Sequence, residues 1–228
     1  MSLILHIDTA TEKAQVSISK DAVMLQVFYN DSLKDHASFL QPAIERLMKE
    51  TSFRLPDIDA IAITAGPGSY TGLRVGMASS KGLCYALQKP LIALNTLEVL
   101  AASSLSLLTE TPNNEIGLLC PMIDARRMEV YTAIYDRQLQ VVLNPSTCIL
   151  SGSSFEKELK HKRVVFFGNG AKKWEEICNN PNAIFKNVEI LPGAMARLAE
   201  RDFIFKKFSN LANSEPDYLK EIYTIQKK

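Results

Sequence analysis

The feature that most constrains this sequence is a glycine-rich junction, TAGPGSYTGLRVG, which runs from Thr64 to Gly76. An apolar strand is predicted before it, and a helix rich in small residues is predicted after it. Gly66 and Gly68 flank Pro67, so the backbone can turn sharply where side chains would obstruct it. Such a junction has two uses: its free N–H groups bind an anion, or its backbone approaches another helix closely.

The spacing of this junction differs from the common phosphate-binding loops. A Walker loop needs a lysine after its last glycine, but Leu73 follows Gly72, and a dinucleotide-binding loop needs glycine where Thr71 stands. Inside the predicted helix, Gly72, Gly76 and Ser80 recur at every fourth position. Because an interior helical glycine costs up to ~1 kcal/mol, this spacing favours close contact with a helix of a partner molecule, with packing inside the chain as the alternative. An anion site at the helix start stays open.

Composition narrows the class of protein. The chain has 228 residues, 46% of them hydrophobic, enough for one large domain or two small ones. Its formal net charge of +1 argues against tight direct binding of a long nucleic acid. The sequence shows no signal peptide and no apolar run of membrane-spanning length. The four cysteines form no Cys-x-x-Cys pair, which predicts reduced thiols in a cytoplasmic protein.

Hydrophobic periodicity predicts an α/β protein with two similar halves. Residues 1–108 are expected to form one domain and residues 109–228 a second, each beginning with an antiparallel meander and continuing with alternating helices and strands. The strands are predicted at 3–7, 14–19, 23–29, 58–64, 91–94, 117–123, 129–135, 138–143, 164–167 and 188–191. The helices are predicted at 38–51, 71–88, 95–108, 153–159, 171–178 and 194–208.

Few residues suggest chemistry. Asp8, Thr9 and Thr11 lie in the first predicted turn, where actin-like and sugar-kinase folds place an acidic residue that works with Mg²⁺-nucleotide. A simple Asx turn explains the same aspartate. The three histidines lack metal-ligand spacing, and no Ser-His-Asp or Cys-His arrangement can be argued. The adjacent Arg126 and Arg127 could bind a phosphate or carboxylate, or they could simply be solvated or form salt bridges with neighbouring residues.

Several segments, in order along the chain, resemble the bacterial TsaB (YeaZ) family, which is also called M22 glycoprotease-like. The sequence departs from that family at Ala10, where serine is usual, and at Met128, where glycine is usual. The segments that carry the resemblance are Ile7–Thr9, Ala65–Gly76, Lys81–Leu83, Pro121–Tyr131 and Pro216–Leu219.

The resemblance implies an actin-like (ASKHA, ribonuclease H-like) fold, with two lobes that each hold a mixed sheet and helices. It also implies a role in threonylcarbamoyladenosine modification beside the anticodon of ANN-decoding tRNAs. There the partner TsaD transfers the threonylcarbamoyl group, TsaE is an ATPase, and TsaB is a non-catalytic dimerisation subunit that also pairs with itself. No catalytic residue, cofactor or metal is therefore expected in this chain, and tRNA is expected to bind only through the complex.

The resemblance further implies that two helices of this chain dock on TsaD. A bulky residue at Gly76 is then expected to block the heterodimer and leave the monomer folded. Two other classes remain as alternatives: an ATP-binding ASKHA kinase or ATPase that depends on Asp8, and an M22-type metallopeptidase that needs zinc. The predicted interface residues are His36, Phe39, Leu40, Ala43 and Leu47 of the first helix and Gly72, Leu73, Gly76, Ser79 and Ser80 of the second.

Overall fold

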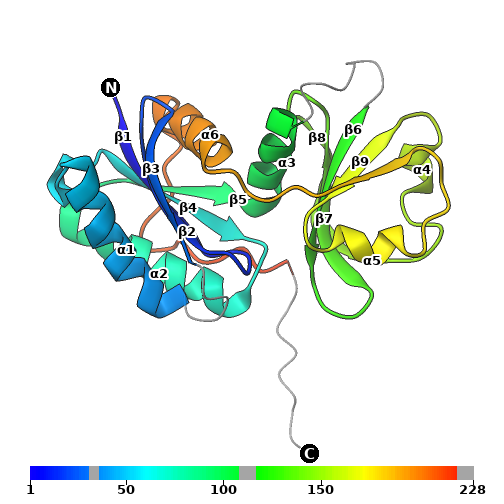
Figure 1. Cartoon of the computed structure of the whole chain (residues 1–228), viewed down its shortest axis with the longest axis horizontal. Coiled ribbons are helices and arrows are strands. Elements are labelled where there is room, and N and C mark those ends of the chain that lie inside the picture. Colours follow the sequence, from blue (N-terminus) through cyan, green and yellow to red (C-terminus); the bar gives the residue numbers. More distant parts are fainter. Residues whose placement is uncertain (31–35, 108–116, 220–228) are drawn as a thin grey trace, which may run out of the picture.

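Two five-stranded mixed sheets form the two lobes of the molecule (Figure 1). The structure is a computed structural model that describes residues 1–30, 36–107 and 117–219. The strand order is β3-β2-β1-β4-β5 in the first sheet and β10-β9-β6-β7-β8 in the second. In each sheet the first three strands are an antiparallel meander and the last two pair in parallel. The predicted two-lobed α/β architecture is therefore confirmed.

The first sheet contains β1 (Leu3–Asp8), β2 (Gln15–Lys20), β3 (Val23–Tyr29), β4 (Ala60–Gly66) and β5 (Leu91–Asn95). The second contains β6 (Leu118–Asp124), β7 (Glu129–Tyr135), β8 (Val141–Ile149), β9 (Val164–Phe167) and β10 (Ala183–Lys186). The helices are α1 (His36–Thr51), α2 (Tyr70–Leu87), α3 (Thr96–Leu107), α4 (Glu156–Leu159), α5 (Ala171–Glu175) and α6 (Pro192–Ile204), with a 3₁₀ turn η1 (Leu55–Asp57).

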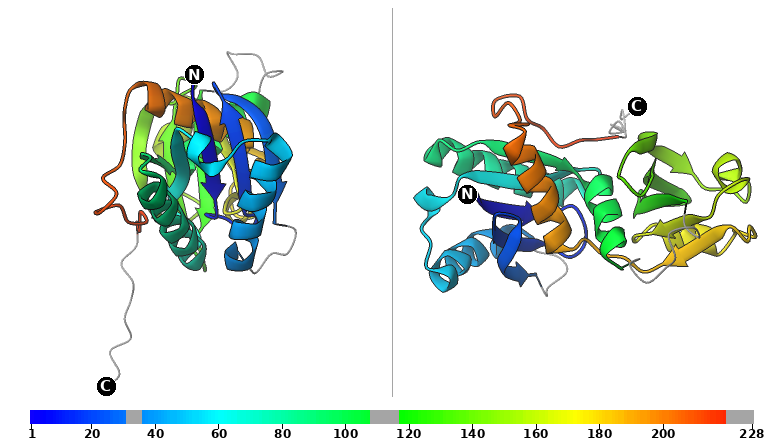
Figure 2. Two further views of the ribbon diagram at one scale, coloured as in Figure 1. Left: turned by 90° about the vertical axis from the view of Figure 1, so that its left-hand side faces the viewer. Right: turned by 90° about the horizontal axis from the view of Figure 1, so that it is seen from above.

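The helices and sheets stack in five layers (Figures 1 and 2). Helices α1 and α2 cover one face of the first sheet, and α3 and α6 cover the other. Helix α3 also contributes Leu97 and Leu100 to the core of the second sheet, so it lies between the two sheets. Helices α4 and α5 cover the outer face of the second sheet, around the buried Trp174.

The end of the chain returns to the first lobe. Helix α6 packs on α3 and on strands β1, β3 and β5, because its apolar stripe, which includes Met195 and Leu198, covers Ile4 and its neighbours. Beyond it, Asp217 N donates to Ala65 O at 2.7 Å. The predicted division after residue 108 falls in a stretch outside the described residues. By packing, α6 and residues 205–219 belong to the first lobe.

Two strands of the second sheet differ from the sequence prediction. Residues 188–191, which were predicted as a strand, are not in a strand in the structure. The last strand is β10 instead, and its Phe185 ring stacks on the Phe166 ring with the centroids 5.6 Å apart. The predicted strand at 138–143 begins later, at Val141, and continues to Ile149. Asp136 explains the shift, because its Oδ1 accepts from the N–H groups of Gln138 and Gln140 and holds them in a turn.

The turn between β1 and β2 lies directly against the start of α2. Ser69 caps the helix by accepting from Gly72 N at 3.3 Å, and Ser69 N donates to Ala10 O at 2.7 Å. The hydroxyl of Thr9 donates to Gly72 O at 2.7 Å. These bonds hold the turn and the helix together along most of the glycine-rich junction.

The glycines of the junction make this contact possible. A Cβ on Gly68 would collide with Ala10 O, and one on Gly72 would collide with Thr9 O. A Cβ on Gly76 would meet the hydroxyl of Thr9. Gly82 is different, since a Cβ there has no neighbour within 4 Å. The inward glycines of α2 are thus used inside the chain, whereas Gly82 faces open space.

We predict opposite effects from one substitution at two positions of α2. Gly76→Ala should destabilise the fold, because overpacking against Thr9 costs about 1–3 kcal/mol and exceeds the helix-propensity gain of up to about 1 kcal/mol. Gly82→Ala should keep that gain and raise stability. Chemical denaturation of both variants measures the difference. Equal effects at the two positions would contradict the packing described for α2.

Candidate functional site

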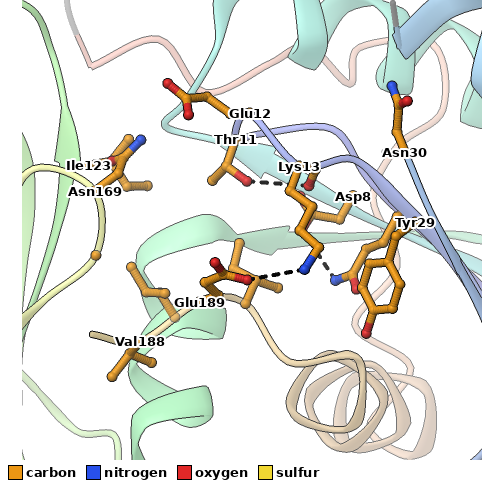
Figure 3. Close-up of a pocket in the computed structure, with 14 residues that line it drawn as sticks. Asp8, Thr11, Glu12, Lys13, Tyr29, Asn30, Ile123, Asn169, Val188 and Glu189 are labelled. Carbon is orange, nitrogen blue, oxygen red and sulfur yellow. Dashed lines mark hydrogen bonds and ion pairs between the residues drawn. The ribbon is translucent and has the colours of Figure 1, made fainter. Parts of the chain in front are cut away.

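A cavity of about 330 Å³ lies between the two lobes (Figure 3). The β1–β2 turn and the end of β3 form its first-lobe wall. The loop that follows β9 and the stretch around residues 188–190 form its second-lobe wall. Its polar lining includes Asp8, Thr11 and Gln15 from the first lobe and Asn169 and Glu189 from the second.

Asp8 stands at the end of β1, and its carboxyl group is held by three donors. Thr64 Oγ1 donates to it at 2.7 Å, Ala10 N at 3.0 Å and Gln15 Nε2 at 3.3 Å. The bond from Ala10 N is the Asx turn that the sequence left as an alternative. Burial, the largest influence, raises the pKa of Asp8 above its usual value of 3.8, although these hydrogen bonds oppose the shift. Asp8 thus ties β1, β2 and β4 together.

The other two predicted residues of this turn face different ways. Thr9 is fully buried and points to α2, where its hydroxyl donates to Gly72 O. Thr11 lines the cavity, and its hydroxyl donates to Lys13 O at 3.4 Å. Behind the turn, His36 Nε2 lies 3.2 Å from Thr11 O. Only Asp8 and Thr11 of this trio therefore lie on the cavity wall.

An ion pair crosses the cavity from one lobe to the other. Lys13 Nζ lies 3.3 Å from Glu189 Oε2 and 4.6 Å from the centre of the Tyr29 ring (Figure 3). Sequence reasoning missed both members of this pair. Lys13 is close in sequence to Asp8, but no local pattern indicates that Glu189, 176 residues away, reaches the same cavity.

Sequence reasoning also missed Gln15. Its side chain is 3% exposed and donates to Asp8, but its Oε1 has no hydrogen-bond partner among the described residues. Alternation along β2 indicates that Gln15 shares a face with Ser17 and Ser19. That pattern alone does not show that this face meets the second lobe.

The start of α2 offers little room for an anion. Its cap and first turn use their N–H groups within the protein: Ser69 N donates to Ala10 O, Gly72 N to Ser69 Oγ and Leu73 N to Ser69 O. The anion-binding capacity of a helix start depends on free N–H groups. This end of the helix is therefore occupied largely by the β1–β2 turn.

The predicted interface residues lie close together, but most of them are buried in the core of this chain. Leu40, Ala43 and Leu47 of α1 pack with the first sheet and α2 in one core. Gly72, Leu73, Gly76 and Ser80 of α2 are buried as well. His36, Phe39 and Ser79 are partly exposed. In this conformation a partner can reach only the last three of these residues. The expectation that a bulky residue at Gly76 leaves the monomer folded is wrong, because a side chain there would collide with Thr9.

The adjacent arginines that the sequence singled out lie outside the lining of the cavity. Across the described ranges 1–30, 36–107 and 117–219, no group of three or more His, Cys, Asp or Glu side chains is placed to hold a metal ion. Arg126 and Arg127 form the β6–β7 turn with φ values of 68° and 49°, and both are exposed. In the same ranges, no helix combines the length and the apolar character needed to cross a membrane.

The Asp8 hydrogen bonds lead to a prediction for Asp8→Asn. Because burial raises the pKa of Asp8 in the folded chain, wild-type stability should fall as pH rises from about 4 through the folded-state pKa. The variant cannot ionise, and the Gln15 amide can turn so that its unpaired Oε1 accepts from the new side-chain amide. Denaturation between pH 4 and 8 should show that the free energy of unfolding of the variant, relative to that of wild type, increases as pH rises. A constant deficit at every pH would contradict this account.

Comparison with known protein families gives a match along most of the chain. The model of the TsaD family, described as tRNA N6-adenosine threonylcarbamoyltransferase, matches residues 30–205. This range includes α1, the glycine-rich junction and every strand of the second sheet.

Individual relatives point to one branch of that family. The chain is 30% identical over 170 residues to the tRNA threonylcarbamoyladenosine biosynthesis protein TsaB of Bacillus subtilis, covering 73% of this chain and 70% of the relative. It is 27% identical to TsaB of Escherichia coli, and the match covers 95% of this chain and 94% of that protein. The structure of YeaZ from Pseudomonas aeruginosa aligns with a TM-score of 0.78 and 26% identity, over 96% of this chain and 100% of that one. The chain therefore belongs to the TsaB family, within the wider group that the TsaD model describes.

Proposed function

We propose that this chain is a non-catalytic partner subunit in tRNA threonylcarbamoyladenosine biosynthesis. In this proposal a TsaD subunit transfers the threonylcarbamoyl group to the adenosine next to the anticodon of ANN-decoding tRNAs, and this chain supports TsaD by docking on it. The observation that carries the proposal is the family membership, because the relatives that cover most of the chain are named for this pathway.

The chemistry of the cavity supports a subunit without its own reaction. The carboxyl group of Asp8 is buried and engaged by three donors. The ammonium group of Lys13 is paired with Glu189. An actin-like kinase would need the acidic group of this turn free for a magnesium nucleotide. Here Asp8 is engaged within the fold, and Lys13 joins the two lobes.

The outer surface of α1 and α2 supports a docking role. The two helices lie side by side on one face of the first sheet (Figure 1). Small residues of α2 face outward between their buried neighbours: Thr71, Ala78 and Gly82 are exposed. Small side chains allow a second helix to approach closely, as in membrane helix pairs. We therefore place the docking face at these outward positions and at the partly exposed His36 and Phe39, beside the buried residues that the sequence indicated.

The rest of the assembly follows from the same proposal. The chain forms a heterodimer with TsaD, TsaE joins them in a ternary complex, and the chain pairs with itself through the same face when TsaD is absent. With a formal net charge of +1, it leaves most of the tRNA contact to its partners. Incubated alone with tRNA and threonylcarbamoyl-AMP it should transfer nothing, and transfer should require added TsaD.

An ATP-binding kinase or ATPase is the second candidate, because the cavity lies at the β1–β2 turn where actin-like folds place an acidic residue for a magnesium nucleotide. The three donors that engage Asp8 argue against it. Calorimetry with Mg-ATP decides between the two. We expect no heat of binding from the isolated chain. Heat that Asp8→Asn abolishes, with the variant still folded, would support the nucleotide-binding alternative.

The docking face gives a prediction for Gly82→Leu. Since Gly82 faces open space, the variant monomer should keep or gain thermal stability. A leucine there should hold a partner helix away and weaken association with TsaD by about tenfold or more. Titration calorimetry or biolayer interferometry measures the affinity.

The matched control is Gly152→Leu in the second lobe, also exposed, where a Cβ would lie in ordinary contact at 3.8 Å from Ile177 O. It should bind TsaD like wild type. Normal TsaD affinity of a folded Gly82→Leu variant would rule out this face as the docking site.

A further inference from the structure

Residues 205–219, which follow α6, form a strap that runs beside α2 in the opposite direction (Figures 1 and 2). Near the start of the strap, Ser209 N donates to Leu91 O of β5 at 2.8 Å. Farther along, the ammonium group of Lys81 on α2 donates to Ala212 O at 3.2 Å. The strap is therefore fastened both to the edge of the first sheet and to α2.

The strap and α1 lie on opposite sides of α2. Helix α1 packs against β2 and β3, whereas α2 packs mainly against β4, and the strap meets the edge strand β5. The strand order β3-β2-β1-β4-β5 therefore sets α2 between α1 and the strap. Leu211 of the strap also packs against the core that α1 and α2 share with the sheet. A partner that covers the exposed stripe of α2 consequently borders the strap.

Tyr218 of the strap forms an exposed cluster with Tyr70 and Arg74 of α2. The centroids of the two tyrosine rings lie 5.2 Å apart. Arg74 Cζ lies 4.4 Å from the centre of the Tyr70 ring, and Arg74 Nε donates to the Tyr218 hydroxyl at 3.2 Å. Tyr70 is 41% exposed and Tyr218 36%, and Arg74 is exposed as well. The strap thus holds an accessible guanidinium group in one orientation.

The guanidinium group of Arg74 still has donors to offer a partner. Its bond to Tyr218 uses Nε, and within residues 1–30, 36–107 and 117–219 no carboxylate forms an ion pair with Arg74. A planar guanidinium binds a carboxylate through two parallel hydrogen bonds. Tyrosine and arginine are also enriched among the residues that dominate binding energy at protein interfaces.

We propose that the strap is the third element of the docking face and holds Arg74 in place to bind a carboxylate of TsaD. This rests on the proposed docking of the chain on TsaD and adds the chemistry of one contact. Arg74 continues the docking face, because it lies one helical turn from both Thr71 and Ala78 on the same exposed stripe of α2.

A protein carboxylate suits this place better than an RNA phosphate. Binding along a phosphate backbone needs several cations together. The neighbouring cation on α2, Lys81, is engaged by the carbonyl groups of Ala212 and Ser214. The small residues beside Arg74 instead favour the close approach of a helix, and a carboxylate on that helix pairs with Arg74 at the edge of the contact.

Arg74→Lys tests the contact, because lysine keeps the charge but loses the planar pair of donors. Calorimetry with TsaD and the full chain should show an affinity about tenfold lower than that of wild type. The matched control is Arg197→Lys on α6, at the opposite face of the first sheet. Arg197 is also exposed and donates to a hydroxyl, Ser106 Oγ, at 2.9 Å. The control should bind TsaD like wild type.

Tyr218→Phe tests the role of the strap, because it removes the hydroxyl and keeps the ring. It should weaken TsaD binding by about threefold in the wild-type chain. In an Arg74→Met background, which has no donor for the hydroxyl, it should change nothing further. A strap that merely tethers the chain end would give the same effect in both backgrounds. All these positions are exposed, and circular dichroism confirms that each variant is folded.

Three results would overturn the proposal. They are equal TsaD affinities of Arg74→Lys and Arg197→Lys, an effect of Tyr218→Phe that does not depend on Arg74, and an Arg74→Lys variant that loses only tRNA binding in the assembled complex. The last result would assign Arg74 to a phosphate. If Gly82→Leu weakens TsaD binding and Arg74→Lys does not, the docking face stands and this contact falls. Failure of the wild-type chain to bind TsaD would remove both.

Discussion

The structure depends on the close contact between the β1–β2 turn and the first turns of α2. Thr9 and Ala10 lie so near the helix that Gly68, Gly72 and Gly76 have no room for a side chain. Two hydrogen bonds, from Thr9 Oγ1 to Gly72 O and from Ser69 N to Ala10 O, fix the arrangement. This contact places the buried stripe of α2 on the first sheet and leaves its opposite stripe exposed.

The same contact occupies much of the junction that looks like a ligand loop. Its N–H groups at Ser69 and Gly72 are used by the turn and by the helix cap. Asp8, at the other end of the turn, is engaged by Thr64, Ala10 and Gln15. The carboxyl group of Asp8 and these N–H groups are thus used within the fold. What remains exposed is the outer face of α1 and α2.

The sequence predicted the architecture well, because both lobes carry clear hydrophobic periodicity and strong turn signals. It also indicated that the glycines of α2 serve close packing. It favoured packing against a partner helix, although the fourfold spacing is the same for internal and external contacts. In the structure, Gly72 and Gly76 pack against Thr9 of this chain, and the exposed glycine is Gly82. Glu189 and Gln15 were missed because the cavity joins residues from opposite ends of the chain. Likewise, no local signal shows that α6 covers the first sheet.

The central claim is that this chain acts by docking through the outward face of α1 and α2. Hydrogen–deuterium exchange with and without TsaD tests it most directly, because slowed exchange maps the covered surface. The account predicts slower exchange in α1 and α2, with the β1–β2 turn and residues 188–190 at the cavity unchanged. Slowed exchange at the cavity and none in α1 or α2 would contradict it.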